Sequence, residues 1–470
     1  MKPKSIAAAG AAAFSLLLSG NALAQTAPDK GDTAWMLIST ILVLLMIVPG
    51  LALFYGGLVR VKNMVSMLSQ VTAVCAIGVV MWAIWGYSFA FTDGGPVDLF
   101  VGGFGRLFLA GVTPESAVAT FSTGVVIPEF AFIAFQGTFA CITAALVLGG
   151  VAERMKFSAV VLFAVLWPLL VYYPIAHMVW WWPGPDAIAS APDAPIRAGL
   201  LWSFGALDFA GGTVVHINSG VAALVGALVL GARHGYRKEL MLPHSLTLTT
   251  VGAGMLWVGW FGFNAGSNLE ANGYAALAMV NTLLAAAAAS VSWMLAEWAT
   301  KKKPSLLGLA SGLVAGLVAV TPAAGFSGPM GAIFLGLIVS PICLIFCSSI
   351  KHALGYDDSL DAFGIHGIGG IVGAIGTAIV VNPMFGGAGV VDYATCALDG
   401  DISTCDIAAY SLGAQLLAQI KAVLVTVAWS GAGSAIVFFA IRALTGGRVP
   451  KEIEVDGLDL REHGEAAYHA

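Results

Sequence analysis

Asp208-Phe-Ala-Gly-Gly-Thr-Val-Val-His216 and Asp358-Ser-Leu-Asp-Ala-Phe-Gly-Ile-His366 follow one pattern, in which a histidine lies eight positions after an aspartate. Each segment opens a long apolar stretch of the chain. Glycine follows each histidine by four positions and again by ten, at Gly220 and Gly226 in the first segment and at Gly370 and Gly376 in the second. We therefore interpret the two segments as copies of one structural unit.

The composition around these copies is that of a chain surrounded by lipid. Of 470 residues, 59% are hydrophobic and only 10% are charged, and the mean hydropathy is +0.89. Soluble domains carry roughly 25% charged residues, so this sequence cannot build an extensive water-facing surface. The net charge of -5 is small, and no basic patch indicates a nucleic-acid partner.

About eleven apolar stretches reach the roughly 20 residues that a membrane-crossing helix needs. Their approximate bounds are 34–58, 64–91, 128–151, 158–181, 206–231, 245–266, 274–298, 305–322, 329–350, 362–382 and 409–443. The first copy opens the fifth span and the second opens the tenth, so the copies enter the membrane from opposite faces. We predict an all-α polytopic membrane protein with an inverted repeat of five plus five helices and one extra helix at the end.

The repeat places His216 and His366 at a similar depth. Eight helical residues rise about 12 Å, which brings each histidine from the edge of a roughly 30 Å hydrocarbon core to near its centre. Two histidines at equivalent positions there favour a shared functional site, and the alternative is that each only bridges neighbouring helices. An imidazole pair can pass a hydrogen bond or a proton without carrying a full charge.

Basic residues indicate which side of the membrane is cytoplasmic. If the N-terminus lies outside, the inner linkers and the tail hold Arg60, Lys62, Arg154, Lys156, Arg233, Arg237, Lys238, Lys301, Lys302, Lys303, Lys351, Arg442, Arg448, Lys451 and Arg461. The opposite side holds little beyond Lys30, Arg106 and Arg197. This asymmetry predicts a periplasmic N-terminus and a cytoplasmic C-terminus. Lys421 is the exception within the last span, where we expect it to snorkel or to face protein.

The first residues form a separate segment. Lys2 and Lys4 precede a mostly apolar run over 6–18, and small residues lead to Asn21-Ala22-Leu23-Ala24. This pattern predicts a cleaved signal peptide at residues 1–24, with a retained signal anchor as the alternative. The remainder divides into a membrane domain at 25–445 and a cytoplasmic C-terminal regulatory tail at 446–470. These features together predict a multi-pass protein of a Gram-negative inner (plasma) membrane.

The six cysteines divide by location. Cys75, Cys141, Cys343 and Cys347 fall within predicted spans, where small packing residues are expected. Cys396 and Cys405 lie together in the outer loop 383–408. Because the outer side is oxidising, we predict a disulfide that closes this loop, with two free thiols as the alternative.

Motifs distributed along the chain carry a family resemblance. They are Pro49-Gly50-Leu-Ala-Leu-Phe-Tyr55-Gly-Gly, Phe135-Gln-Gly-Thr-Phe139-Ala, Pro174-Ile-Ala-His177-Met-Val-Trp180, Asp208-Phe-Ala-Gly-Gly-Thr-Val-Val-His216-Ile-Asn, Gly259-Trp-Phe-Gly-Phe263-Asn-Ala-Gly-Ser267 and Phe363-Gly-Ile-His366-Gly. In this order they resemble the Amt/Mep/Rh family of ammonium transporters, on its bacterial Amt branch. The resemblance runs from about residue 30 to the C-terminus and implies a homotrimer of independent eleven-helix pores.

The resemblance also implies roles for particular residues. They are an outer recruitment site of Trp180, Phe135 and Ser267 with Asp208 beside it, a gate of Phe139 and Phe263, and a pore pair of His216 and His366. Aromatic faces attract cations, and apolar rings below them would exclude hydrated ions. Each residue also has a simpler interpretation. Trp180 would belong to an interfacial aromatic belt, the phenylalanines to core or lipid-facing packing, and Asp208 to a helix cap.

The implied function is ammonium transport and not catalysis. NH4+ would be recruited at the periplasmic face and deprotonated, and NH3 would pass into the cytoplasm, with or without coupled H+, through an apolar pore lined by the two histidines. The implied substrates are ammonium and ammonia, with methylammonium left open, and no cofactor or metal is expected. The tail resembles the segment that meets a PII-type nitrogen signal protein in relatives, and a disordered solvated tail is the alternative.

The sequence fits three other functions less well than transport. An ammonium sensor on the same fold is disfavoured because no signalling domain follows the last span. An Rh-like gas channel is disfavoured by the intact set of Trp180, Phe139 and Phe263. A membrane enzyme is disfavoured because the sequence has no H-E-x-x-H or G-x-S-x-G motif and no further ligands at metal-site spacing near the histidines.

Overall fold

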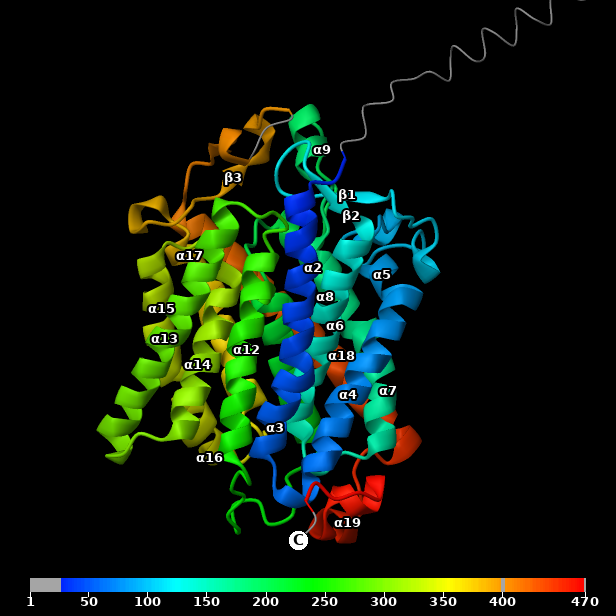
Figure 1. Ribbon diagram of the computed structural model, residues 1–470, viewed down its shortest axis with the longest axis vertical. Coiled ribbons are helices and arrows are strands. Elements are labelled where there is room, and N and C mark those ends of the chain that lie inside the picture. The colour runs from blue at the N-terminus through cyan, green and yellow to red at the C-terminus, as the bar shows by residue number, and fades with distance from the viewer. Residues whose placement is uncertain (1–26, 399–401, 469–470) are drawn as a thin grey trace, which may run out of the picture.

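The computed structural model describes residues 27–398 and 402–468, and it is built almost entirely from helices that run side by side (Figure 1). The predicted signal peptide at 1–24 lies outside the described residues. The helices are α2 (Lys30–Leu45), α3 (Ala52–Leu58), α4 (Met64–Met81), α5 (Tyr87–Phe91), α6 (Glu129–Val151), α7 (Phe157–Trp167), α8 (Tyr173–Trp180), α9 (Pro185–Ser190), α10 (Leu200–Ser203), α11 (Asn218–Leu230), α12 (Leu246–Gly266), α13 (Gly273–Lys301), α14 (Leu306–Val320), α15 (Pro329–Ile345), α16 (Lys351–Leu354), α17 (Ile368–Val380), α18 (Leu412–Thr445) and α19 (Lys451–Asp456).

Within the described residues, eleven helical segments are long and apolar enough to cross a membrane. They are Lys30–Leu58, Val61–Phe91, Glu129–Val151, Phe157–Trp180, Gly212–Leu230, Leu246–Gly266, Gly273–Lys301, Leu306–Ala323, Pro329–Leu354, Phe363–Val380 and Leu412–Thr445. Several are composite, because wider helical turns join α2 to α3, α4 to α5, α7 to α8 and α15 to α16. The predicted all-α polytopic fold with eleven spans is confirmed.

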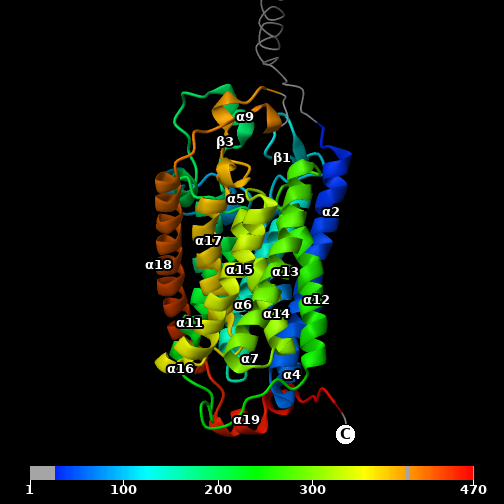
Figure 2. The same cartoon turned by 90° about the vertical axis from the view of Figure 1, so that its left-hand side faces the viewer.

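Asp208 and Asp358 have the same structural role in the two copies of the repeat. The Asp208 carboxylate accepts hydrogen bonds from the backbone N–H groups of Gly211, Gly212, Thr213 and Val214, at 2.5–3.1 Å. The Asp358 carboxylate accepts from those of Ala362, Phe363 and Gly364, at 2.8–3.4 Å. Each aspartate thus satisfies the otherwise unpaired amides at the start of a span. The helix after Asp208 runs downward in Figure 2 and the helix after Asp358 runs upward, as the inverted repeat requires.

The fifth span begins later than its hydrophobicity indicates. The sequence places its start near residue 206, whereas the helix begins at Gly212. Gly211 has a φ of +113°, a backbone conformation that favours glycine, and it turns the chain immediately before the helix. The six intervening residues are therefore a capped turn at the edge of the membrane.

The two copies cross at a point where neither has a side chain. A Cβ atom added to Gly220 would lie 2.1 Å from the backbone nitrogen of Gly367 and 2.4 Å from its Cα. Such contacts are shorter than real Cβ atoms tolerate, so the crossing requires glycine at position 220. Small residues allow this close approach of membrane helices, and here it brings the two histidine-bearing turns into contact.

Loops cover the upper end of the molecule in Figures 1 and 2, opposite α19. Strands β1 (Ala117–Ala119) and β2 (Val126–Pro128) form one antiparallel hairpin, and β3 (Val391–Asp392) and β4 (Asp406–Ile407) form another. Between β3 and β4 the sulfur atoms of Cys396 and Cys405 are joined in a disulfide. The loop predicted at 383–408 is therefore covalently closed near its tip.

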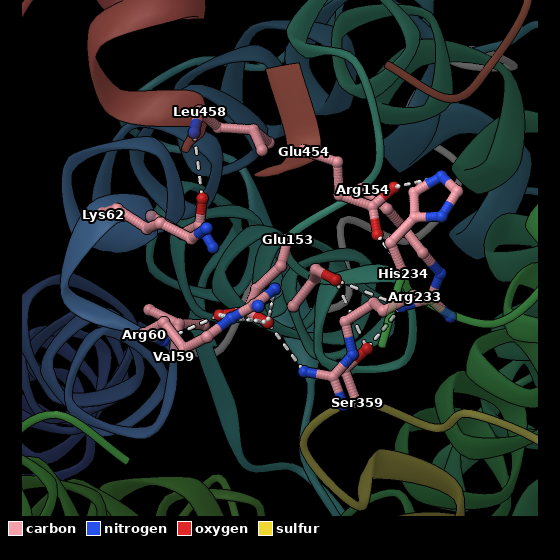
Figure 3. A network of polar contacts seen from close by, with 12 residues as sticks. Val59, Arg60, Lys62, Glu153, Arg154, Arg233, His234, Ser359, Glu454 and Leu458 are labelled. Atoms are coloured by element: carbon pink, nitrogen blue, oxygen red, sulfur yellow. Dashed lines mark hydrogen bonds and ion pairs between the residues drawn. The ribbon is translucent and has the colours of Figure 1, made fainter. Parts of the chain in front are cut away.

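A buried ion-pair network holds the lower end together (Figure 3). Glu153, whose side chain is fully buried, lies between Arg60 at 2.9 Å and Arg233 at 2.8 Å. Arg233 also contacts Asp357 at 2.9 Å. Burial opposes ionisation of Glu153, but Arg233 and Arg60 outweigh it and lower the pKa of this carboxyl to about 2. The linkers after four different spans are thereby joined by charge.

Replacing Glu153 with glutamine should destabilise the protein by about 3 kcal/mol near neutral pH, because Arg233 loses a buried counter-charge. The folded pKa lies below the ordinary value of 4.5, so the carboxylate contributes stability above that value. This contribution is lost as the pH falls toward about 2. Thermal unfolding in detergent across this range should show the gap between wild type and E153Q narrowing with acidity. A constant gap would contradict the assignment, and Glu115→Gln in an exposed upper loop is the control.

The C-terminal segment after α18 packs against the same lower end. Glu454 accepts hydrogen bonds from the backbone N–H of His234 at 2.7 Å and from Arg448 at 2.8 Å. The Asp459 carboxylate accepts from the first amides of α4, at Val65 and Ser66. Figure 3 shows the hydrogen bond that Leu458 donates to the side chain of Asn63. The tail is thus in contact with the loops between spans at several points.

Candidate functional site

An aromatic cluster lies beneath the upper loops. Phe135 on α6 and Trp180 at the end of α8 both approach Phe139, with ring centroids 4.9 Å and 5.9 Å away. Ser267, which follows α12, donates its hydroxyl to the carbonyl of Phe263 at 2.8 Å. Its neighbour Gly266 packs so closely on the Phe135 ring that an added Cβ would lie 3.0 Å from it. The structure therefore brings together the three residues of the expected recruitment site.

Phe139 and Phe263, the residues of the expected gate, adjoin this cluster. Their rings stack with centroids 4.2 Å apart and planes inclined by 20°. Both side chains are fully buried. Two stacked apolar rings offer nothing to replace the hydration shell of an ion, so hydrated ions are excluded unless the rings move.

His216 and His366 form the next layer. Their Nδ1 atoms are 3.3 Å apart, and their rings lie 5.3 Å apart with planes inclined by 23°. One Nδ1 must donate its hydrogen to the other, because two bare nitrogens would repel each other at this distance. It follows that the two Nε2 atoms differ, one being a bare acceptor and the other carrying hydrogen. The Nε2 of His216 is buried and makes no hydrogen bond to any residue that the structure describes.

Two cavities adjoin this pair. A small cavity of about 10 Å³, enough for one water-sized molecule, lies against both histidine rings and Phe263. Its walls are apolar except for His216, His366 and Trp260, and they include Phe263. A larger cavity of about 390 Å³ begins at His366 and is lined farther down by charged residues of the lower loops, namely Arg233, Arg237, Glu239, Lys351 and Asp361.

Asp208 reaches the aromatic cluster through its backbone. Its carboxylate also accepts the hydroxyl of Thr213, so both oxygens are engaged in capping the fifth span. Its carbonyl oxygen accepts the indole N–H of Trp180 at 2.9 Å. The aspartate therefore fixes the orientation of the Trp180 ring while its carboxylate faces backbone amides.

The aromatic cluster adjoins the stacked rings, the stacked rings adjoin His216, and the larger cavity begins at His366. The Ammonium Transporter Family matches residues 34–468 of this chain. The chain belongs to this family.

Relatives within the ammonium transporter family resemble the chain over nearly its whole length. The ammonium transporter of Aquifex aeolicus is 43% identical, covering 94% of this chain and 94% of that protein. The ammonium transporter of Bacillus subtilis is 41% identical over 94% of this chain and 99% of that protein. Among solved structures, Saccharomyces cerevisiae Mep2 is 31% identical with a TM-score of 0.76, covering 93% of each chain. A structure described as "Sensor Amt Protein" is 26% identical with a TM-score of 0.77, covering 92% of this chain and 98% of that one.

In this ammonium transporter family member, the sequence patterns did not predict a role for Trp260. Trp260 stacks on the ring of His216 at 5.4 Å, with planes inclined by 22°. Its indole N–H donates to Thr321 at 2.9 Å, and Thr321 donates in turn to Asn264 at 3.3 Å. A signal was available, because Trp260 precedes the expected gate residue Phe263 by three positions and so shares its helix face.

Proposed function

We propose that this chain transports ammonium by recruiting NH4+ at its upper end and conducting NH3 past the histidine pair, with or without a coupled proton. The observation that carries the proposal is the single line of layers from the aromatic cluster through the stacked gate to two adjoining imidazoles. An apolar path of this kind disfavours a bare cation and suits a small neutral molecule. The proposed substrates are ammonium and ammonia, with methylammonium open.

Recruitment uses the faces of Trp180 and Phe135 together with the oxygen of Ser267. A cation against an aromatic face gains roughly 0.5–2 kcal/mol, depending on how far it is desolvated. Ammonium can also donate a hydrogen bond, and the Ser267 oxygen can accept one while its own hydrogen remains on the Phe263 carbonyl. Asp208 assists by holding Trp180 and by contributing negative charge near the entrance.

Conduction below the gate uses the different hydrogen-bonding states of the two imidazoles. Because one Nδ1 donates to the other, one Nε2 accepts and the other donates. Ammonia both donates and accepts, so it can exchange hydrogen bonds with the pair in the small cavity beside them. It then enters the larger lower cavity, whose charged walls favour water and reprotonation.

The membrane setting follows from the charge distribution. We assign the upper end to the periplasm and the lower end to the cytoplasm of a bacterial inner membrane, since the basic linkers gather at the lower end. Residues 25–445 then form the transport domain. Residues 446–470 form a cytoplasmic regulatory tail. Because the sequence of this tail resembles the tail of the family, we propose that it binds a PII-type protein. A homotrimer is proposed on the same resemblance.

An ammonium sensor is the second candidate. The likeness to the structure described as "Sensor Amt Protein" favours it, since the two share a fold over most of both chains. A sensor would bind ammonium at the aromatic cluster with little turnover, whereas a transporter would pass it on. The two functions therefore differ in the current that follows an ammonium jump.

The test is a current measurement on a solid-supported membrane, with purified protein in liposomes and a rapid rise in ammonium. A saturable current in protein-containing liposomes and none in empty ones is expected. If no current flows but the internal pH shifts, the protein conducts neutral ammonia and does not couple it to a proton. Silence in both measurements, with ammonium binding intact, would overturn transport in favour of the sensor.

Replacing Trp180 with leucine should raise the ammonium concentration at half-maximal current by up to about thirtyfold, because the strongest cation–π face is lost. The maximal current should change much less, since the gate and histidines are untouched. Trp298→Leu is the matched control, because Trp298 is 53% exposed at the far end of α13. An unchanged half-saturation in W180L would place recruitment elsewhere.

A further inference from the structure

His177 is a buried titratable residue that the proposed mechanism does not use. It lies on α8 three positions before Trp180, and its side chain is fully buried. Its ring nitrogens face the end of α5 and the loop that follows it. It therefore belongs to the support of the recruitment site and not to the path itself.

Both ring nitrogens of His177 face backbone carbonyl oxygens. Nδ1 lies 3.0 Å from the carbonyl oxygen of Ala90, and Nε2 lies 2.7 Å from that of Asp98. A carbonyl can only accept, and a neutral imidazole has a single N–H to donate. In the neutral ring one bare nitrogen would therefore face an oxygen lone pair at hydrogen-bond distance. Only the doubly protonated imidazolium satisfies both contacts.

Burial opposes a charged ring at this position, and nearby carboxylates offset part of that cost. Asp98 and Asp93 face it from the loop after α5, with an Asp98 carboxylate oxygen 3.8 Å from Nε2. Arg197, on the segment before α10, contacts Asp93 at 3.1 Å and Asp98 at 3.3 Å. Two carboxylates thus share one guanidinium, and an imidazolium at His177 brings this cluster to neutrality. A hydrogen bond from the Gly95 amide, with Arg197, holds the pKa of Asp93 below its usual range.

The contacts of His177 fix the end of the helix that carries Trp180. The His177 carbonyl accepts the N–H of Trp181 at 3.1 Å, and the Trp181 ring stacks on the imidazole at 5.1 Å. Gly199 packs against the same carbonyl so closely that an added Cβ would lie 2.2 Å from its oxygen. The end of α8 is thereby held by His177 on one side, while the Asp208 carbonyl holds the Trp180 indole on the other.

We propose that His177 is a positioning residue, held as an imidazolium between the carbonyls of Ala90 and Asp98, that orients Trp180 for ammonium recruitment. The inference rests on the proposed role of Trp180 as part of the recruitment site. It predicts the protonation state of the His177 ring, which can be measured without transport. It also predicts the ammonium concentration at half-maximal current.

Protonation is tested by nitrogen-15 NMR of wild-type protein in lipid with labelled histidine, near pH 7. The His177 signals are those missing from a His177→Gln variant among the eight histidines of the chain. Two protonated ring nitrogens are expected. One protonated and one bare nitrogen would overturn the imidazolium. If the variant folds poorly, the same signals are assigned in the wild-type spectrum through correlations with the backbone of His177.

Positioning is tested with the same variant in the ammonium-jump assay. His177→Gln should raise the half-saturating ammonium concentration about tenfold, through loss of one charge-assisted contact, and change the maximal current less than about twofold. His244→Gln at the lower end is the matched control. Equal half-saturation in H177Q and wild type would overturn the positioning role. Absence of current in the wild type would instead refute transport and leave the NMR result standing.

Discussion

Replacing both His216 and His366 with alanine should reduce the saturating ammonium current at least about a hundredfold, the low end of what positioned proton-transfer groups contribute. The pair provides one hydrogen-bond acceptor and one donor in an otherwise apolar cavity. With both rings removed, ammonia would have to cross this layer without a polar partner. Loss of the imidazoles also removes the groups best placed to pass a proton.

The comparison needs a variant that loses a histidine elsewhere. His244→Ala serves, because His244 donates to the Val59 carbonyl at the lower end and does not line the pore. Currents should be recorded with ammonium and with potassium, normalised to the amount of protein in the liposomes. A selective ammonium current of wild-type size in the double variant would show that the histidine layer is not required for transport.

Replacing Asp208 with alanine should lower the free energy of unfolding by about 3 kcal/mol or more. With the loss of the two histidines, this is one of the two largest effects that we expect. Four backbone amides and the Thr213 hydroxyl would lose their acceptor, and each buried group left unpaired costs about 1–3 kcal/mol. Asp208→Asn should cost less, because one side-chain oxygen still accepts. Thermal unfolding in a fixed detergent measures both.

Asp186→Ala is the matched control for this cap. Asp186, in the first turn of the short helix α9, also accepts a backbone N–H, from Gly124, and that is its carboxylate's one hydrogen bond within the described residues. The Asp186→Ala substitution should lower the unfolding temperature of the protein only slightly. If Asp208→Ala were equally mild, the carboxylate would not be a structural cap, and a direct role in binding ammonium would become the better explanation for its position.

The sequence predicted the parts of the site that depend on spacing. The separation of Asp208 from His216, repeated from Asp358 to His366, was enough to predict the inverted repeat and the similar depth of the histidines. Helix geometry makes such spacing informative, since eight residues span a known rise. The number of spans followed from hydropathy for the same reason.

Features that depend on contacts between distant segments could not be predicted in this way. Hydropathy alone also misplaced the start of the fifth span, although a helix cap was already one interpretation of Asp208. The ion-pair network of Arg60, Glu153, Arg233 and Asp357 joins linkers after four spans, and only the folded chain brings them together. Lys421 was expected to snorkel or face protein, and its Nζ lies 5.4 Å from the centre of the Phe204 ring, a cation–π contact with no periodic signal.

The glycine crossing of the two repeat copies constrains how the sequence can evolve. When a large side chain appears at a helix contact, a second mutation that shortens its partner usually relieves the clash. At Gly220 that route is closed, because the opposing atoms belong to the backbone of Gly367, which has no side chain to shorten. A selection for suppressors of Gly220→Ala should therefore return revertants or shifted helices and never a substitution at 367. The duplicated halves are bound to each other at a position where neither can compensate for the other.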